Sequence, residues 1–265
     1  AIFPFHTWIP MLARETHPYA AAFVIFLLPT SLSFLGLDYL NAYRDMEISS
    51  VIFTAIRGAG LMMVIGGGLW AVFERHLARM MGYAAIVQIG LGLLAISLIG
   101  VVRSNSPLGG LFFAQLFPQL ISLSVWSLAL SSIRQRKPGL LFYDVQGLAH
   151  QMPLTVACLS LASFSLAGIP LLASFPGNMT LWSTLSPGYL PYSLLSLFGM
   201  MCLFAATLRA SAVFVMSPDT GAWQISEKGF LPLLLVAGVL FLFVIGLATQ
   251  VFLPVLTNLA SIFIF

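Results

Sequence analysis

Few side chains in this sequence could carry proton, metal or haem chemistry. Only 7% of its 265 residues are charged, and its four histidines lie outside the centres of the apolar segments, at His6, His17, His76 and His150. A haem held by two histidines deep in a helical bundle is therefore not expected. An intramembrane protease or acyltransferase is also disfavoured, because it needs a deep nucleophile beside a base. No phosphate loop, metal-binding cysteine pair or nucleic-acid motif occurs, so we predict no metal, no cofactor and no nucleic-acid partner.

Three charged residues fall inside apolar segments, where a charge is costly and often functional. Asp38 and Arg57 approach the same end of two consecutive segments. An antiparallel helix pair could join them as an ion pair, or each could extend separately to the membrane surface. Arg209 lies about one helical turn from the end of its segment, so we expect its side chain to reach the surface.

The elements that must position these residues are long apolar segments. Hydrophobic residues make up 60% of the sequence and the mean hydropathy is +1.01, whereas a soluble domain usually carries about 25% charged residues. Apolar runs of this kind cross bilayers as helices, which satisfy every backbone polar group internally. Seven such runs occur, near 18–42, 50–73, 80–102, 109–133, 153–175, 190–214 and 230–253. The sequence predicts an all-α, polytopic membrane protein of about seven transmembrane helices, forming one membrane domain over 1–265.

Prolines predict that some of these helices are broken. Pro29, Pro118 and Pro170 fall inside runs and each removes a helix hydrogen bond. Such breaks can mark an ion pathway, although a simple kink is an equally good explanation for any one proline. The triple glycine at 66–68 is interpreted as a site of close helix packing.

The basic residues indicate how the chain is oriented. If the runs cross the membrane alternately, one side collects seven cations, and the other side has only Arg44 and Arg103. The seven are Arg14, Arg75, Arg79, Arg134, Arg136, Lys137 and Lys228. The positive-inside rule then predicts a cytoplasmic N-terminal segment and an outer C-terminus, in an inner or plasma membrane.

The sharpest local pattern is the segment PFHTWIP at 4–10, just ahead of the first run. On its own it could be an aromatic anchor at the membrane surface. It also resembles the PFHxWLP motif of the antiporter-like subunits of respiratory complex I, a family that includes Mrp-type cation/proton antiporters and membrane-bound hydrogenase subunits. The matching residues are Pro4, Phe5, His6, Trp8 and Pro10.

Three further stretches resemble the same family in the same order. Residues 79–90 are similar to its KRLLAYSSISQMG stretch. Residues 147–153 are similar to its GLGRRMP loop, with His150 and Gln151 in place of two arginines. Residues 166–175, which include Gly168, Pro170 and Phe175, resemble SLAGLPPLSGF at the family's broken twelfth helix. The resemblance covers about 4–178 directly, and the last two runs fit by count.

The resemblance implies that the seven runs correspond to helices eight to fourteen of the family's fourteen. It also implies departures, because the family moves protons along buried lysines and a glutamate. The family's lysine of helix eight falls at Pro29 or Thr30, that of helix eleven near Pro118 or Gln119, and the charge of helix twelve at Asn178. None of these residues titrates near neutral pH.

We therefore predict a degenerate, non-pumping, structural subunit in the membrane arm of a complex I-like NADH/quinone oxidoreductase, and not a catalyst itself. Its partners would be other membrane-arm subunits, a chain or segment supplying the N-terminal half, and lipid. The alternative is half of an active cation/proton transporter whose charged residues come from a partner chain. A carbon-uptake or hydrogenase assembly that reuses the same module is a third reading.

Overall fold

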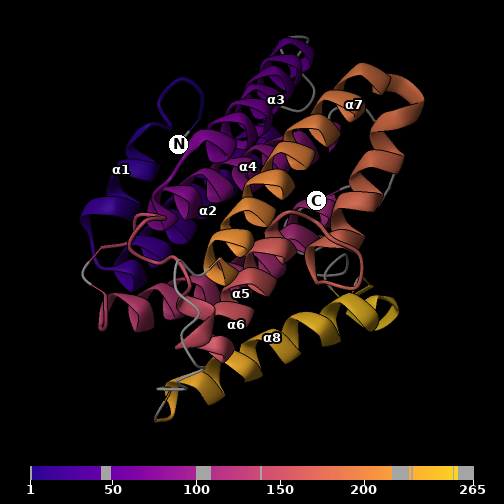
Figure 1. Ribbon diagram of the computed structural model, residues 1–265. Coiled ribbons are helices and arrows are strands. Elements are labelled where there is room, and N and C mark those ends of the chain that lie inside the picture. The colour runs from indigo at the N-terminus through magenta and orange to yellow at the C-terminus, as the bar shows by residue number, and fades with distance from the viewer. Residues whose placement is uncertain are drawn as a thin grey trace.

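The described chain is a bundle of helices in a computed structural model. Residues 2–42, 49–99, 109–137, 139–216, 227, 229–252 and 254–255 are described. Within them the elements are α1 Trp8–Glu15, α2 Pro18–Ala42, α3 Ser49–Phe73, α4 Leu77–Ile99, α5 Gly109–Arg134, η1 Leu148–His150, α6 Pro153–Leu166, α7 Ser174–Val215 and α8 Leu231–Leu247 (Figure 1). Five of these, α2 to α5 and α7, are long and apolar enough to span a membrane, and α6 and α8 are shorter apolar helices. The protein is therefore an all-α polytopic membrane protein, as predicted.

Helix α4 is the core of the bundle, because most of its residues are buried. It packs against α3 along most of its length, and also against α1, α2, α5 and α7. Glycines allow the closest approach: a Cβ added to Gly60 on α3 would lie 2.8 Å from the carbonyl oxygen of Gly90 on α4. Without an apolar driving force between helices in lipid, such close packing supplies much of the attraction.

The triple glycine has the packing role that the sequence indicated. A Cβ on Gly67 would lie 3.1 Å from the carbonyl oxygen of Tyr83 on α4, and one on Gly68 would lie 2.2 Å from that of Gly199 on α7. Gly66, in contrast, has open space around its Cβ position. Helix α3 therefore uses two of the three glycines to contact neighbours on two sides.

The run predicted at 153–175 is broken in the structure. Helix α6 ends at Leu166 and α7 begins at Ser174. Between them Gly168 and Leu171 adopt left-handed backbone angles, with φ of 74° and 76°. The break supports the resemblance to a discontinuous helix at this place in the sequence.

Helix α7 differs most from the prediction, which ended one run at 175 and began the next at 190. The structure is helical from Ser174, and the helix bends at Tyr189, whose φ of −138° and ψ of 48° are not helical. Pro187 and Pro191 flank the bend and remove helix hydrogen bonds there. The polar residues of the first half of α7 lowered its hydropathy, so the run there was not recognised. Their hydroxyls nevertheless bond within the helix: Thr180 donates to the Pro176 carbonyl at 2.7 Å.

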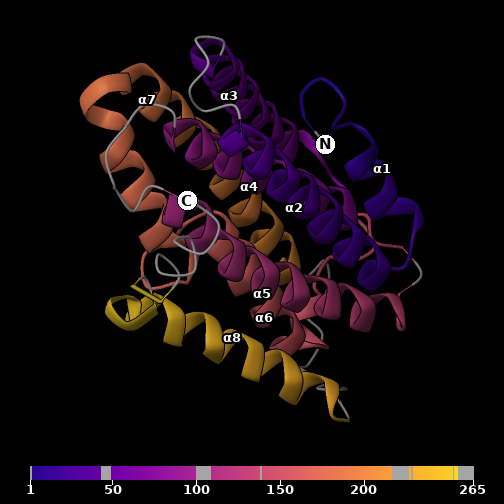
Figure 2. The same ribbon diagram turned by 180° about the vertical axis from the view of Figure 1, so that it is seen from behind.

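Helix α8 lies against α5 and α6 at one side of the bundle (Figures 1 and 2). It ends at Leu247 and is shorter than the run predicted at 230–253. The loop before it carries Glu227, whose carboxylate accepts hydrogen bonds from the backbone N–H groups of Leu154 and Thr155 at 3.2 and 2.7 Å. Glu227 thus caps the start of α6, where free N–H groups favour a negative charge.

Candidate functional site: buried amides at the centre of the bundle

A small polar cavity lies at mid-height in the bundle. Gln88 is twelfth of the 23 residues of α4, so it lies about 16 Å from either helix end, near the middle of a bilayer core about 30 Å thick. The cavity measures about 10 Å³ and is lined by Pro29, Thr30, Ser33, Gln88, Ile89, Gly92, Phe112, Gln115, Leu116 and Gln119. Pro29 and Thr30, the two alternatives for the helix-eight position, and Gln119, one alternative for the helix-eleven position, therefore meet at one place.

Gln88 connects this cavity to the break after α6. Its side-chain amide donates a hydrogen bond of 2.6 Å to the backbone carbonyl of Leu166, the last residue of α6. The last carbonyls of a helix have no partner within it, so Gln88 satisfies a group that would otherwise be costly in the core of the bundle. This contact joins two of the motif stretches recognised in the sequence.

Asn178 lies on the other side of the same break. Its side chain is 0% exposed, and a Cβ added to Gly168 would lie 2.7 Å from its side-chain nitrogen. Gly168 also has a φ of 74°, which favours glycine. Both requirements explain the glycine of this motif, since a larger residue would meet strain and the Asn178 amide together.

Two of these amides lack hydrogen-bond partners among the described residues. They are Gln115 and Asn178, and neither the oxygen nor the nitrogen of either side chain is bonded. Gly177, next to Asn178 in the chain, packs against α5, because a Cβ added there would lie 3.5 Å from Cγ of Gln115. Of the two amides, Gln115 lines the cavity. Buried unsatisfied groups of this kind usually bind water, and a cavity of about 10 Å³ is at the lower limit for one water molecule.

The chemistry available to this site is that of neutral dipoles. An amide donates through its nitrogen and accepts through its oxygen, but it does not gain or lose a proton near neutral pH. The cavity can therefore order water without holding a charge. Pro118, the remaining path position, is buried in α5 beside Gln119 but does not line the cavity.

The aromatic motif forms the start of the structure and packs on α4. Trp8 begins α1, and Pro10 lies against Gly82, where an added Cβ would be 2.8 Å from the Pro10 Cα. Pro4 and Phe5 are exposed, and burial lowers the pKa of His6 from 6.5. Two motifs that are distant in sequence thus contact each other.

The residues at the break are placed differently from one another. Pro170 is exposed in the turn between α6 and α7, while Phe175 is partly buried in the first turn of α7. Only Gly168 of this motif contacts an amide of the site.

The ion pair that was one of two alternatives for Asp38 and Arg57 does not form among the described residues, where Arg14 pairs with Glu15 and Arg79 with Glu74. Asp38 is exposed on α2. Arg57 is 4% exposed and turns inward: its Nε and Nη2 donate to the hydroxyl and the carbonyl of Ser97, at 3.3 and 3.2 Å. The side chain of Arg57 is thus enclosed between helices, at the level of the last turn of α4.

Aromatic rings complete the surroundings of Arg57. Its guanidinium carbon lies 3.8 Å from the ring centre of Tyr189 and 5.8 Å from that of Tyr192. A ring face attracts a cation, most strongly where water is excluded. Sequence reasoning missed these partners because they come from α4 and α7, far along the chain.

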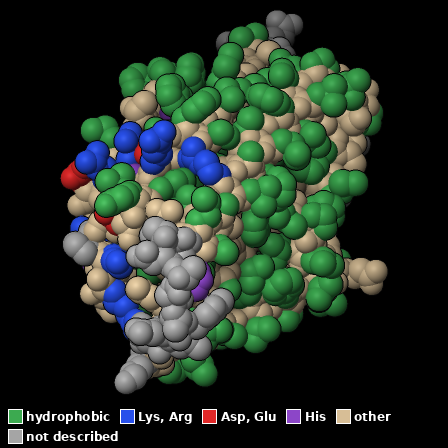
Figure 3. Space-filling model, viewed as in Figure 1, with side chains coloured by type: hydrophobic (Ala, Val, Ile, Leu, Met, Phe, Trp, Pro, Cys, Tyr) green, Lys and Arg blue, Asp and Glu red, His purple; other side chains and the backbone are tan. Residues whose placement is uncertain are grey.

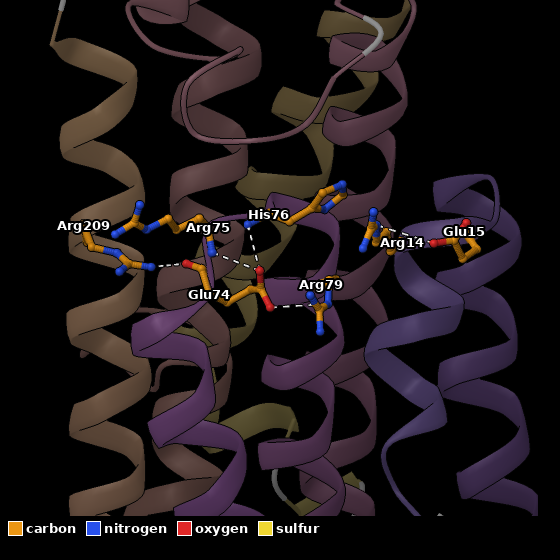
Figure 4. Close-up of polar contacts among 7 residues, drawn as sticks. All are labelled: Arg14, Glu15, Glu74, Arg75, His76, Arg79 and Arg209. Carbon is orange, nitrogen blue, oxygen red and sulfur yellow. Dashed lines mark hydrogen bonds and ion pairs between the residues drawn. The ribbon is translucent and has the colours of Figure 1, made fainter.

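Arg209 is partly buried and reaches the turn between α3 and α4, at the end of α7 to which its side chain was expected to extend. Its Nη2 donates to the backbone carbonyl of Glu74 just after α3, and its guanidinium lies over the ring of Phe142, 5.0 Å from the centre. Figure 4 shows this network: the Glu74 carboxylate contacts Arg79 at 3.3 Å and accepts hydrogen bonds from the backbone N–H groups of Arg75 and His76. The end of α7 is thereby fixed to the turn between α3 and α4.

The comparisons with known proteins agree with this architecture. The family model for the transmembrane region of NADH:quinone oxidoreductase and Mrp antiporter subunits matches residues 1–208. NADH-quinone oxidoreductase subunit N of Polaromonas naphthalenivorans (strain CJ2) is 28% identical, covering 92% of this chain and 51% of that protein. The corresponding subunit N of Moorella thermoacetica is 25% identical, covering 92% and 50%. The chain thus spans about half the length of the curated relatives it matches.

Solved structures show the same fold. A chain of the archaeal membrane-bound sulfane sulfur reductase superposes with a TM-score of 0.91 at 19% identity, covering 100% of this chain and 53% of that one. A chain of the Mrp complex from Dietzia sp. DQ12-45-1b gives 0.85 at 17% identity, covering 100% and 57%. A chain of respiratory complex I from Thermus thermophilus gives 0.72 at 18%, covering 99% and 55%. With the family model matching most of its length, the chain belongs to the NADH:quinone oxidoreductase/Mrp antiporter family of integral membrane subunits.

Proposed function

We propose that this chain is a degenerate, non-pumping subunit with a structural role in the membrane arm of a complex I-like NADH/quinone oxidoreductase. The observation that carries the proposal is the lining of the central cavity. Pro29, Thr30 and Gln119, candidates for two of the family's proton-path positions by the resemblance, line it, and no residue of that lining is ionisable. Asn178, the path position of the broken helix, is a neutral amide beside Gly168.

A physical argument connects this lining to the loss of pumping. Moving a proton through the bilayer core requires groups that take up and release charge, because an isolated charge there costs several kcal/mol or more. An amide can align a water molecule but cannot store the proton between steps. A path lined only by amides therefore has no ionisable side chain whose protonation could be changed by a redox reaction elsewhere in the complex.

The proposed partners are other membrane-arm subunits, lipid, and a chain or segment that completes the family's fold. Apolar side chains are exposed along α2, α7 and α8, for example Phe23, Leu194 and Leu233 at 64%, 59% and 65%. Figure 3 shows that hydrophobic side chains dominate one side of the molecule, while the basic residues gather at the opposite edge. We propose that this basic edge is cytoplasmic, with the N-terminal segment inside and the C-terminus outside.

The decisive experiment measures proton translocation by the intact complex in proteoliposomes. Gln115→Met and Gln119→Met remove amides while nearly preserving side-chain volume, and neither should change the number of protons moved per electron pair. The matched control replaces a buried lysine in a related subunit of the same complex that has kept it, which should lower that number. A lower proton yield in either amide variant would contradict a non-pumping role.

The alternative function is half of an active cation/proton transporter whose charges come from a partner chain. It is favoured by the unbonded amides of Gln115 and Asn178, which could border a hydrated path shared with that partner. Mass spectrometry of the intact assembly separates the two. A complex I-like oxidoreductase contains flavin or iron–sulfur subunits, as would a hydrogenase-type assembly, whereas a separate antiporter purifies without them.

A further inference from the structure

Two arginines meet at the basic end of α3 and α7 without an acidic partner. Arg209 on α7 donates to the carbonyl of Glu74, and Arg75 is the next residue along the chain. The carboxylate of Glu74 is occupied by Arg79 and by the backbone N–H groups of Arg75 and His76. Neither Arg75 nor Arg209 belongs to an ion pair of the described residues. Neither positive charge is therefore neutralised by an ion pair among the described residues.

The two charges are close enough to affect each other. Burial is the largest cost of the Arg209 charge, the neighbouring charge of Arg75 adds to that cost, and the charge of Glu74 offsets part of it. Figure 4 shows both side chains leaving the same corner of the structure, Arg209 from α7 and Arg75 from the turn after α3. Like charges at such a distance are stabilised when an anion lies between them.

The backbone around this corner is held in place. The segment at Arg75 pairs with the strand-like segment near Leu141: Phe142 donates to the Arg75 carbonyl at 2.9 Å, and Leu77 donates to the Leu140 carbonyl at 3.0 Å. The same pairing places the Phe142 ring under the Arg209 guanidinium. The backbone at Arg75 is thus held by hydrogen bonds to the segment at 140–142, and the Arg209 guanidinium is held against the Phe142 ring.

One donor at this corner has no partner. The Nε–H of Arg209 is buried and makes no hydrogen bond among the described residues. A guanidinium has five N–H donors in a planar fork that matches the oxygens of a phosphate. Arg209 uses one nitrogen for the Glu74 carbonyl. The Arg75 side chain belongs to neither ion pair of the described residues, so donors of both guanidinium groups remain for an anionic ligand.

The surface next to this corner is suited to lipid. Trp70 and Phe73, in the last turn of α3, are 60% and 70% exposed. Tryptophan and other aromatic residues are enriched at the depth of the lipid headgroups. The candidate membrane span of α3 ends at Phe73, so Arg75, two residues later, falls at the level of the headgroups beside these rings.

We propose that Arg75 and Arg209 bind the phosphate of an anionic phospholipid in the cytoplasmic leaflet, with its acyl chains against Trp70 and Phe73. Charge complementarity carries the choice of ligand, because basic sites between membrane helices on the cytoplasmic side hold anionic headgroups. This site rests on the proposed cytoplasmic orientation of the basic edge, but it is independent of the amide cavity and of whether the subunit moves protons. It would fasten the end of α7 to the turn between α3 and α4 through a bound lipid.

The test is photocrosslinking in the intact membrane complex. Vesicles contain phosphatidylglycerol with a diazirine on the acyl chain, and mass spectrometry quantifies adducts on the peptide that contains Trp70 and Phe73. We expect labelling of this peptide in the unaltered chain, and a decrease of about fivefold in Arg75→Gln. Arg209→Gln should give a similar decrease. Arg75 is exposed, so its replacement should leave the fold intact even if Arg209→Gln does not.

Two controls define the outcomes. Arg14→Gln removes an exposed arginine from the same end of the protein but away from the pair, and labelling should be unchanged. A phosphatidylcholine probe with the same acyl chains should label this peptide less. Equal labelling by both lipids, equal loss in Arg14→Gln, or full competition by free inorganic phosphate would each overturn the proposal, the last by assigning the site to free phosphate.

Discussion

The guanidinium carbon of Arg57 lies 3.8 Å from the ring centre of Tyr189, the residue at which α7 bends. Pro187 and Pro191 make a bend possible by removing hydrogen bonds, but they do not specify its direction. Arg57 also donates to Ser97 on α4. A single buried cation therefore connects α3 and α4 to the bend and orients the first half of α7, which carries Asn178.

Replacing Arg57 by glutamine should destabilise the protein by about 1–2 kcal/mol, because the cation–ring contact and the forked hydrogen bonds to Ser97 are lost. Arg57→Lys should lose less, since it keeps the charge but not the fork. Thermal unfolding of the detergent-solubilised protein measures whether Arg57→Lys is more stable than Arg57→Gln. Tyr189→Phe keeps the ring face and should resemble the unaltered protein, whereas Tyr189→Leu should resemble Arg57→Gln. Equal stability of the phenylalanine and leucine variants would contradict the cation–ring contact.

Adjacent glycines in α3 provide a second prediction with an internal control. Gly68→Ala places a Cβ 2.2 Å from the carbonyl oxygen of Gly199, so α3 and α7 must separate, at a cost of about 1–3 kcal/mol. Gly66→Ala makes the same change where nothing lies within 4 Å, and should be neutral or stabilising by up to about 1 kcal/mol. Thermal unfolding of both variants is the measurement, and similar losses in the two would show that helix contact is not the cause.

Much of this architecture could be predicted from local patterns. Apolar runs identified the membrane helices, and the glycine and proline of the 166–175 motif indicated the break after Leu166. These features depend on residues close together in sequence, where hydropathy and backbone chemistry act directly. The first half of α7 was missed because its threonines and serines lowered the local hydropathy, although their hydroxyls bond to their own helix.

The site was only partly predictable. The resemblance named Pro29, Thr30 and Gln119, but that they line one cavity depends on how α2, α4 and α5 pack. Arg57 shows the same limit: its charge suggested the nearest acid, Asp38, whereas its partners are Ser97 and the bend of α7. The partners of Arg57 are set by how α3, α4 and α7 pack, which the spacing of residues in the sequence does not specify.

The break after α6 yields a prediction about Gly168. Gly168→Ala should cost about 1–3 kcal/mol, because alanine is strained at a φ of 74° and its Cβ would lie 2.7 Å from the Asn178 amide. Asn178→Ala removes the contact between the new Cβ and the amide, but leaves the backbone strain at position 168. A double-mutant cycle measured by thermal unfolding should therefore show partial rescue. Full additivity would mean that the Gly168 and Asn178 positions do not constrain each other.

The pH dependence of stability should report on His76, in the turn between α3 and α4. Burial, with the charges of Arg14, Arg79 and Arg134 outweighing that of Glu74, lowers the pKa of His76 below 6.5 in the folded protein. The unfolded chain then binds the proton more readily, so the stability that His76 contributes is complete above about pH 6.5 and is lost as the pH falls toward the lower, folded-state pKa. Thermal unfolding between neutral pH and about pH 5 should show this decline. His76→Gln, which cannot be protonated, should make the decline smaller.

The pKa of His6 is also lowered from its ordinary value, so adding His6→Gln should make the loss of stability at low pH smaller still. A steeper loss of stability in His76→Gln than in the unaltered protein would contradict the stated sign.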